Sequence, residues 1–168
     1  MKKTNLSLSP QTLSLPFFVG FSEDELAILA DHCRRSHVPA NTEVVRQGQV
    51  ATEFFLVLDG KLVVETHVPG RGAVVLQTLH RGDVLGWSWL LANGSFAFSA
   101  KTLTETELLT FDGTALLRTC DSHPRLGYLL MRRFAQVMSD RLRHTRVQLL
   151  DLYSPPPGGG AFPALKKR

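Results

Sequence analysis

The sequence lacks the long apolar runs and the dense cysteines that mark membrane-spanning and disulfide-bonded chains. No segment approaches the roughly 20 apolar residues that a membrane helix needs. The N-terminal lysines are not followed by an unbroken apolar run ahead of a small-residue cleavage site, as a signal peptide requires. The two cysteines, Cys33 and Cys120, lie far apart without a CxxC pair. We therefore expect no membrane association, a cytoplasmic location and two thiols that act as small buried hydrophobes.

Recognisable catalytic and metal-binding patterns are missing as well. The six histidines show neither HxH nor HxxxH spacing, and the chain contains no GxSxG nucleophile elbow. A nucleophile, a base and an orienting group cannot be assembled from the sequence. We therefore expect no catalytic residue, no metal site and a chain that is not an enzyme.

The sequence contains enough hydrophobic residues to form the core of one domain with terminal extensions. Of its 168 residues, 43% are hydrophobic and 20% are charged, and domains commonly run to ~100–200 residues. We expect an N-terminal extension over residues 1–16 and a domain over residues 17–153. Residues 154–168 hold four prolines and three glycines, which predicts a flexible tail.

The central part of the chain has the pattern of short strands. From Val38 to Phe111, β-branched runs of four to eight residues alternate with turn residues, as in an all-β sandwich or barrel. Asp59-Gly60 predicts a tight hairpin, and Pro69 with Gly70 predicts a second turn. The expected fold is mainly β with flanking helices: an antiparallel β-roll of the jelly-roll or double-stranded β-helix type, with an N-terminal helix and a long C-terminal helix.

Helical patterns occur on both sides of these strands. Ser22 and Glu25 have the capping-box spacing, which predicts a helix over Ser22–His37. After the strands, Asp112 is placed to cap a short helix. Pro124 suits the first turn of a long helix over about 124–153, because proline is tolerated at that position.

The long helix carries apolar residues at alternating steps of four and three, the spacing of a coiled-coil seam. A helix this long with such a seam presents more apolar surface than one small domain buries, so we expect a homodimer contact. The same part of the chain is rich in arginine within a net charge of +4. These charges fit either an anionic partner or a solvated helix face. The expected interface residues are Met131, Ala135, Met138, Leu142, Leu149 and Leu152.

The order of these elements resembles the cyclic-nucleotide-binding domain of the catabolite activator and Fnr regulator superfamily. The resemblance covers residues 17 to about 153 and rests on an ordered set of glycines, Gly48, Gly60, Gly82 and Gly86, with matching strand lengths between them. It implies a β-roll that binds a cyclic nucleotide. The segments that carry it are FFVGFSEDE (17–25), VRQG (45–48), FFLVLDGKLVV (54–64), LHRGDVLG (79–86), ETELLTF (105–111) and FAQVMSDRL in the long helix.

The resemblance also implies a phosphate-binding cassette, in which a glutamate takes the ribose hydroxyl and an arginine neutralises the phosphate. Leu85-Gly86 retains the first part of that cassette, but Trp87 stands where the glutamate is expected. Phe96, or Ser95 if the loop is shifted by one residue, stands where the arginine is expected. In some family members a threonine of the long helix reaches the ligand across the dimer. The candidate ligand residues are Gly86, Trp87, Ser88, Ser95, Phe96, Phe98, Ser99 and Thr145.

The aromatic residues of this degenerate cassette leave two interpretations open: they fill the vacated pocket, or they line it for an apolar or planar ligand. We expect a stand-alone, homodimeric regulatory or sensory domain that responds to a ligand other than standard cyclic AMP, or that acts through a protein partner. The alternatives are a Crp/Fnr-type transcriptional regulator, or a fragment of one, that binds cyclic AMP, and a ligand-free dimerisation scaffold. No cofactor is expected, and a cyclic nucleotide is not favoured. Because only 15 breaker-rich residues follow Tyr153, where the superfamily's regulators place a helix-turn-helix, we expect no sequence-specific DNA binding from this chain.

Overall fold

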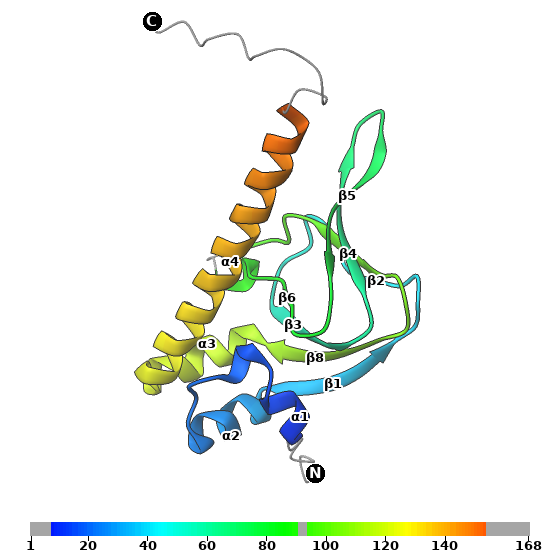
Figure 1. The fold of residues 1–168 in the computed structure, drawn as a ribbon. Coiled ribbons are helices and arrows are strands. Elements are labelled where there is room, and N and C mark those ends of the chain that lie inside the picture. The colour runs from blue at the N-terminus through cyan, green and yellow to red at the C-terminus, as the bar shows by residue number, and fades with distance from the viewer. Residues whose placement is uncertain (1–7, 91–93, 154–168) are drawn as a thin grey trace, which may run out of the picture. The chain divides into compact units, whose positions relative to one another are not determined.

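The computed structural model describes residues 8–90 and 94–153, and the side chains of residues 8–90 and 94–147. The chain divides into two compact units, residues 1–132 and residues 133–168. The first unit contains two four-stranded antiparallel sheets together with the shorter helices, and the second contains most of the long helix (Figure 1). The predicted fold class, mainly β with flanking helices, is confirmed.

Apart from β4 and β5, which form a hairpin within one sheet, consecutive strands belong to different sheets, as in a roll. One sheet has the order β1-β8-β3-β6 and the other has the order β2-β7-β4-β5. Within each sheet all neighbouring strands are antiparallel. The bounds are β1 Cys33–Val38, β2 Glu43–Val45, β3 Glu53–Asp59, β4 Leu62–Val68, β5 Gly72–Leu79, β6 Val84–Leu85, β7 Ser99–Thr102 and β8 Thr106–Asp112.

The predicted hairpin at Asp59-Gly60 is wrong, although the turn itself is present. Gly60 has φ +89°, and a Cβ atom there would lie 2.5 Å from the carbonyl oxygen of Glu105, so only glycine fits. The strands on its two sides, β3 and β4, lie in different sheets and do not pair with each other. Local turn chemistry therefore predicted the bend, whereas the strand partners are set by residues far away in the sequence.

The second predicted turn does close a hairpin. β4 pairs with β5 in an antiparallel ladder that runs from Leu62↔Leu79 to Val68↔Gly72. Pro69 and Gly70 lie in the connection between these strands. This part of the sequence pattern is confirmed.

The N-terminal region contains more structure than the pattern predicted. The helix α1 (Pro10–Leu13) lies inside the predicted extension of residues 1–16, with Ser9 as its N-cap and Thr12 buried. The 3₁₀ helix η1 (Pro16–Phe18) follows. Arg35 donates to the hydroxyl of Thr12 at 3.3 Å, and a guanidinium nitrogen of Arg81 donates to the carbonyl oxygen of Gln11 at 3.2 Å. Both arginines therefore hold α1 against the rest of the first unit.

The predicted helix over Ser22–His37 begins correctly and ends too late. The helix α2 spans Glu23–Asp31, and its capping box is complete, because Ser22 and Glu25 each bond to the other's backbone N–H. The remaining residues form β1, which pairs with β8. That pairing overrides any local helical preference.

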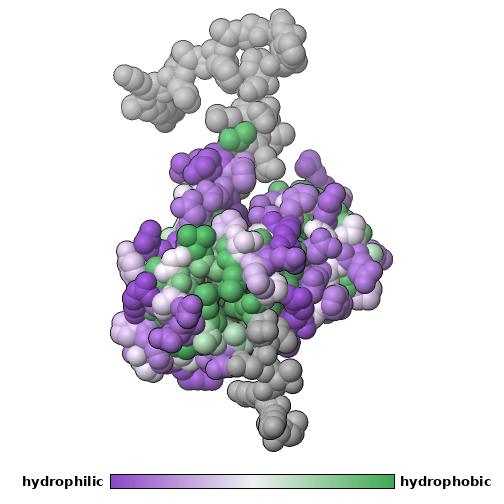
Figure 2. Space-filling view, turned by 60° about the horizontal axis from the view of Figure 1, so that its bottom comes forward, coloured by the Kyte–Doolittle hydropathy of each residue, from purple (hydrophilic) through white to green (hydrophobic). Residues whose placement is uncertain are grey.

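The two C-terminal helices confirm the remaining predictions of secondary structure. The helix α3 spans Gly113–Ser122, and Asp112 caps it by accepting from the N–H of Ala115 at 2.8 Å. The helix α4 spans Pro124–Tyr153. Leu126 and Leu130, on its first turns within residues 1–132, are fully buried. Figure 2 shows apolar residues gathered among polar ones on the face that is turned forward from the bottom of Figure 1.

Candidate ligand pocket

The cassette begins where β6 ends, at Gly86. This residue is buried and has φ +80°, a conformation that glycine adopts without strain. A Cβ atom at Gly86 would lie 3.0 Å from Cε1 of Phe96 and 3.4 Å from the carbonyl oxygen of Glu53. The ring of Phe96 is therefore packed directly over the glycine backbone, and only 6% of Phe96 is exposed.

The residues that follow Gly86 turn into the core. Ser88 and Trp89 are buried in the short 3₁₀ helix η2 (Ser88–Leu90), whereas Trp87 is half-buried. The indole of Trp89 stacks on Phe54 with ring centroids 5.1 Å apart. A Cβ atom at Gly113 would lie 2.6 Å from a carbon of the same indole. Trp89 is therefore a core residue fixed between β3 and the start of α3.

Backbone hydrogen bonds join the return segment of the cassette, residues 94–99, to the loop that follows β2. The N–H of Phe96 donates to the carbonyl oxygen of Gln49 at 2.9 Å, and the N–H of Gly48 donates to the carbonyl oxygen of Phe96 at 2.8 Å. The N–H of Gln47 donates to Oγ of Ser99 at 3.0 Å. These bonds fix the backbone of the return segment against the loop after β2.

The predicted ligand residues are thus divided among different surroundings. Gly86 and Phe96 are in contact, as described above. Ser95 is exposed and forms a β-bridge with Val50, and Phe98 is 42% exposed. The hydroxyl of Thr145 donates to the carbonyl oxygen of Arg141 on its own helix at 3.0 Å.

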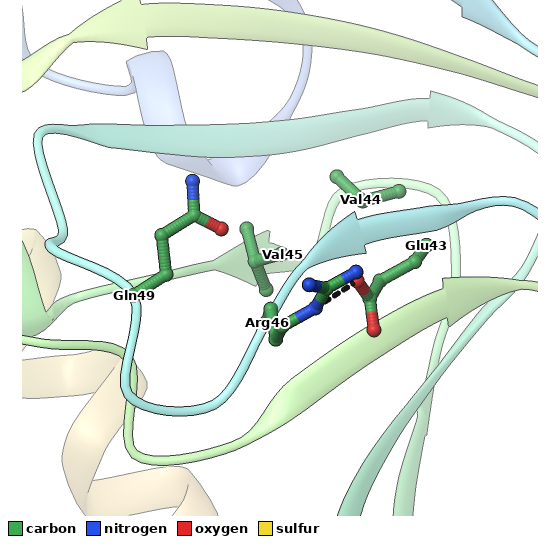
Figure 3. A pocket seen from close by; sticks show the side chains of 5 residues that line it. All are labelled: Glu43, Val44, Val45, Arg46 and Gln49. Carbon is green, nitrogen blue, oxygen red and sulfur yellow. Dashed lines mark hydrogen bonds and ion pairs between the residues drawn. The ribbon is translucent and has the colours of Figure 1, made fainter.

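A hollow of about 440 Å³ lies at β2 and the loop that follows it, and it was not predicted from the sequence. It is lined by β2, by Arg46 and by Gln49. Figure 3 shows Val45 and Gln49 pointing the same way from the chain, while Arg46 pairs with Glu43 beside them. The nitrogen Nε of Arg46 lies 2.7 Å from a carboxylate oxygen of Glu43. The sequence signal that could have found this hollow is the segment VRQG, which places polar side chains around Gly48.

The charges of this region are paired and peripheral. Residues 86–99 contain no acidic or basic side chain. Glu53, whose carbonyl oxygen lies close to Gly86, has its carboxylate 2.8 Å from Arg34. The cassette therefore presents no charged group of its own to an anionic ligand.

The described residues give little support for a reactive thiol, a metal site or a membrane-spanning helix. Burial raises the pKa of the Cys33 thiol to about 11 and also raises the pKa of Cys120, so neither is a reactive thiolate at neutral pH. Within residues 8–90 and 94–153, His, Cys, Asp and Glu form no group of three that could hold a metal ion. The helices of this described part are all too short or too polar to cross a membrane.

Comparisons with known proteins connect this geometry to a family. The chain is 30% identical over 143 residues to the cyclic AMP receptor protein of Thermus thermophilus, and the match covers 83% of this chain and 62% of that protein. It is 26% identical over 123 residues to the potassium channel AKT6 of Arabidopsis thaliana, which covers 73% of this chain and 14% of the channel. The chain therefore spans less than two thirds of the length of these relatives.

Solved structures share the fold. A cyclic nucleotide-binding domain from Methylobacillus flagellatus superposes with a TM-score of 0.73 at 20% identity, covering 82% of this chain and 77% of that one. A regulatory subunit of a cAMP-independent protein kinase A from Trypanosoma brucei, solved as a triple mutant with cAMP bound, superposes with a TM-score of 0.66 at 16% identity, covering 82% of this chain and 48% of that one. The family model for the cyclic nucleotide-binding domain matches residues 35–123. By this match the chain belongs to the cyclic nucleotide-binding domain family.

Proposed function

We propose that this chain is a regulatory or sensory domain whose degenerate cassette does not bind cyclic AMP in the manner of its family. It responds instead to a ligand other than standard cyclic AMP, or it acts through a protein partner. The observation that carries the proposal is the contact between Phe96 and Gly86, where the phenyl ring packs over the glycine backbone. In the family resemblance this glycine is the place where the backbone approaches the ligand.

The chemistry of the site supports the same conclusion. A charge-assisted hydrogen bond contributes ~1.5–3 kcal/mol, and a phosphate that is buried without a partner is costly. Trp87 and Phe96 cannot supply the carboxylate and the guanidinium that the resemblance calls for. We expect affinity for cyclic AMP to be lower by several powers of ten than that of a complete cassette.

We further propose that α4 makes a homodimer. The support is its run of apolar residues at steps of four and three, of which Met138 and Leu142 are 38% and 53% exposed. Exposed apolar side chains at this spacing are typical of a helix that pairs with another helix. A dimeric arrangement suits a regulatory module, since a change in the roll can then be transmitted to a second copy.

The test of the cassette is to restore the two missing charges. The neighbour from Trypanosoma brucei, named for a cAMP-independent kinase, was solved with cAMP bound to a triple mutant in which one substitution introduces an arginine. We expect titration calorimetry to detect no micromolar binding of cyclic AMP to the parent chain. The double variant Trp87→Glu with Phe96→Arg is expected to bind it, because the ribose hydroxyl and the phosphate regain their partners.

A matched control distinguishes restoration of the binding site from the general effect of added charges. The double variant Trp87→Glu with Phe98→Arg carries the same charges, but Phe98 is 42% exposed and we expect no binding. A thermal melt of each variant checks that it is folded. Micromolar binding of cyclic AMP by the parent chain, abolished by Gly86→Trp, would contradict the proposal.

A further inference from the structure

The two sheets of the roll end in four outer strands, β1 and β6 in one sheet and β2 and β5 in the other. An outer strand carries N–H and C=O groups that point away from its sheet, and these groups can pair with a further strand. Natural proteins protect such strands by keeping them short or by placing charged side chains on them. The four outer strands of this roll differ in that protection.

Three of the outer strands are protected. β2 is three residues long and β6 is two residues long, so neither offers a ladder of useful length. β1 is six residues long, but Arg34 and Arg35 are exposed on it and pair with acidic side chains of the same sheet. A strand added to β1 would have to cover these charges, which is costly.

The fourth outer strand, β5, has neither form of protection. It spans the eight residues Gly72–Leu79, none of which is charged. Within residues 8–90 and 94–153 it pairs with β4 on one side and with no strand on the other. Ala73 and Val75 are exposed, Val75 to 57%. A long, uncharged outer strand of this kind is a template for pairing with another chain.

The surroundings of β5 leave room for such a strand. Figure 1 shows the β4–β5 hairpin projecting beyond the other strands of the roll. A Cβ atom placed on Gly70 or on Gly72 would meet no atom within 4 Å. Arg71, at the tip of the hairpin, is exposed and forms no ion pair with another described residue. The edge is therefore uncharged along its length and ends in one positive charge.

A bulge in β5 bears on what kind of strand can be added. Val64 pairs with Gln77 and Glu65 pairs with Val75, so Leu76 has no partner in the ladder. A bulge bends the strand that contains it. A flexible segment can follow this bend, whereas a second copy of the chain would bring a β5 that is already bent within its own sheet. The bend therefore favours a segment that is extended only when it binds.

We propose that the outer edge of β5 binds an extended segment of another protein, which adds to the sheet as an antiparallel strand. The segment is uncharged opposite the eight residues of β5, is rich in β-branched side chains, and carries a carboxylate beside Arg71. Charge complementarity with an uncharged strand that ends in Arg71 is the ground for this choice of occupant. The inference rests on the proposed function and deepens it by naming the class of protein partner.

The experiment uses the full chain and two designed peptides. Both alternate threonine and valine over about eight residues, the length of β5. One peptide ends in two glutamates and the other in two lysines, at the C-terminus, because antiparallel pairing places that end beside Arg71. We expect fluorescence anisotropy to show binding of the glutamate peptide. The lysine peptide should bind about fivefold more weakly or worse, because the contact with Arg71 changes sign.

Methylation of the peptide nitrogens tests whether the backbone makes the contact. Alternate residues of an extended strand direct their N–H groups to opposite sides. Two forms of the glutamate peptide are therefore compared, one methylated at the odd positions and the other at the even positions. We expect one form to lose binding and the other to retain it. A contact made by side chains alone would weaken both forms alike.

Substitutions in the roll locate the contact. Val75→Lys is expected to weaken binding of the glutamate peptide by about fivefold. Arg71→Gln should weaken it by about two- to fivefold and remove the preference for glutamate over lysine. Leu103→Lys is the matched control, because Leu103 is similarly exposed, at 51%, but lies in the connection between β7 and β8. A thermal melt of each variant checks that the roll is folded.

Several outcomes would overturn the inference. They are failure of every peptide to bind, equal binding of the glutamate and lysine peptides, equal losses in the two methylated forms, or equal losses from Val75→Lys and Leu103→Lys. Self-association of the parent chain that is abolished by Val75→Lys would assign the edge to a second copy instead. The cyclic AMP titration does not involve β5, so failure of the cassette proposal and failure of the partner proposal remain distinguishable.

Discussion

The interior of the β-roll and the α4 seam, whose described residues are Met131, Ala135, Met138, Leu142 and Thr145, both contain large apolar side chains, but only those of the interior are buried. Phe54 is fully buried and stacks on Phe111 at 4.5 Å and on Trp89 at 5.1 Å. On the seam, Met138 and Leu142 are substantially exposed. The difference indicates that the roll obtains its stability from its own residues, whereas α4 has apolar surface that a partner can bury.

The largest expected effect comes from placing charges in the seam. The double variant Met138→Lys with Leu142→Lys should convert the proposed dimer to monomers, because lysines would be buried in an apolar contact. Analytical ultracentrifugation across a range of protein concentrations measures this. Sedimentation identical to that of the parent chain would show that α4 is not the site of self-association.

A smaller effect is expected when one side chain of each region is shortened to alanine in separate variants. Phe54→Ala should lower the free energy of unfolding by about 3–5 kcal/mol, because it removes a fully buried ring and leaves a cavity. Met138→Ala should change it by no more than about 0.5 kcal/mol when measured by urea denaturation at a concentration where the chain is monomeric. Equal losses for the two variants would mean that the seam is packed within a single chain.

The smallest effect concerns the ion pair of α2 with the first turn of α4. Burial raises the pKa of Glu25, but the N–H of Ser22 and the guanidinium of Arg125 outweigh it, so the pKa is held below its ordinary value of 4.5. A lowered folded-state pKa adds stability above pH 4.5 that is lost as the pH falls through the folded-state value. Glu25→Gln should therefore lower the free energy of unfolding by only about 1 kcal/mol at neutral pH, since Arg125 is largely exposed.

The pH dependence is the check on that prediction. Denaturation should show that the free energies of unfolding of the parent chain and of Glu25→Gln differ by a constant amount near neutral pH. This difference should narrow as the pH falls below 4.5. Glu23→Gln is the control, because Glu23 is exposed in the same first turn, and its effect should stay small. A difference that widened in acid would contradict the assignment.

The helix starts and the turns could be predicted because their causes are local. Ser22 with Glu25 begins α2, and Asp112 begins α3, each through a side chain that caps the helix within three residues. The strand β1 could not be predicted in the same way. It is fixed by pairing with β8, with Arg35 3.1 Å from Glu107. Contacts between residues this far apart leave no periodic pattern in the segment itself.

In the candidate site, too, the local sequence predicts some features and long-range contacts decide the others. The loss of the cassette's glutamate and arginine could be deduced from Trp87 and Phe96 through the family resemblance. The packing of Phe96 over Gly86 could not, because it depends on how residues 94–99 bond to residues 47–51. The hollow beside Arg46 was missed for the same reason: its lining comes from a bulged edge strand and the loop after it.

The Glu25–Arg125 pair joins two residues one hundred positions apart, and this separation bears on the order in which the chain folds during synthesis. The capping box of α2 is complete as soon as the first turn exists, yet a nine-residue helix is marginal on its own. Its anchors, Arg125 and the β8 partner of the adjoining β1, emerge only after nearly the whole roll has been made. Contacts of such high sequence separation form late and slow folding. We therefore expect α2 to gain its contact with Arg125 only when the start of α4 has been made, so that completion of the roll and attachment of α2 coincide.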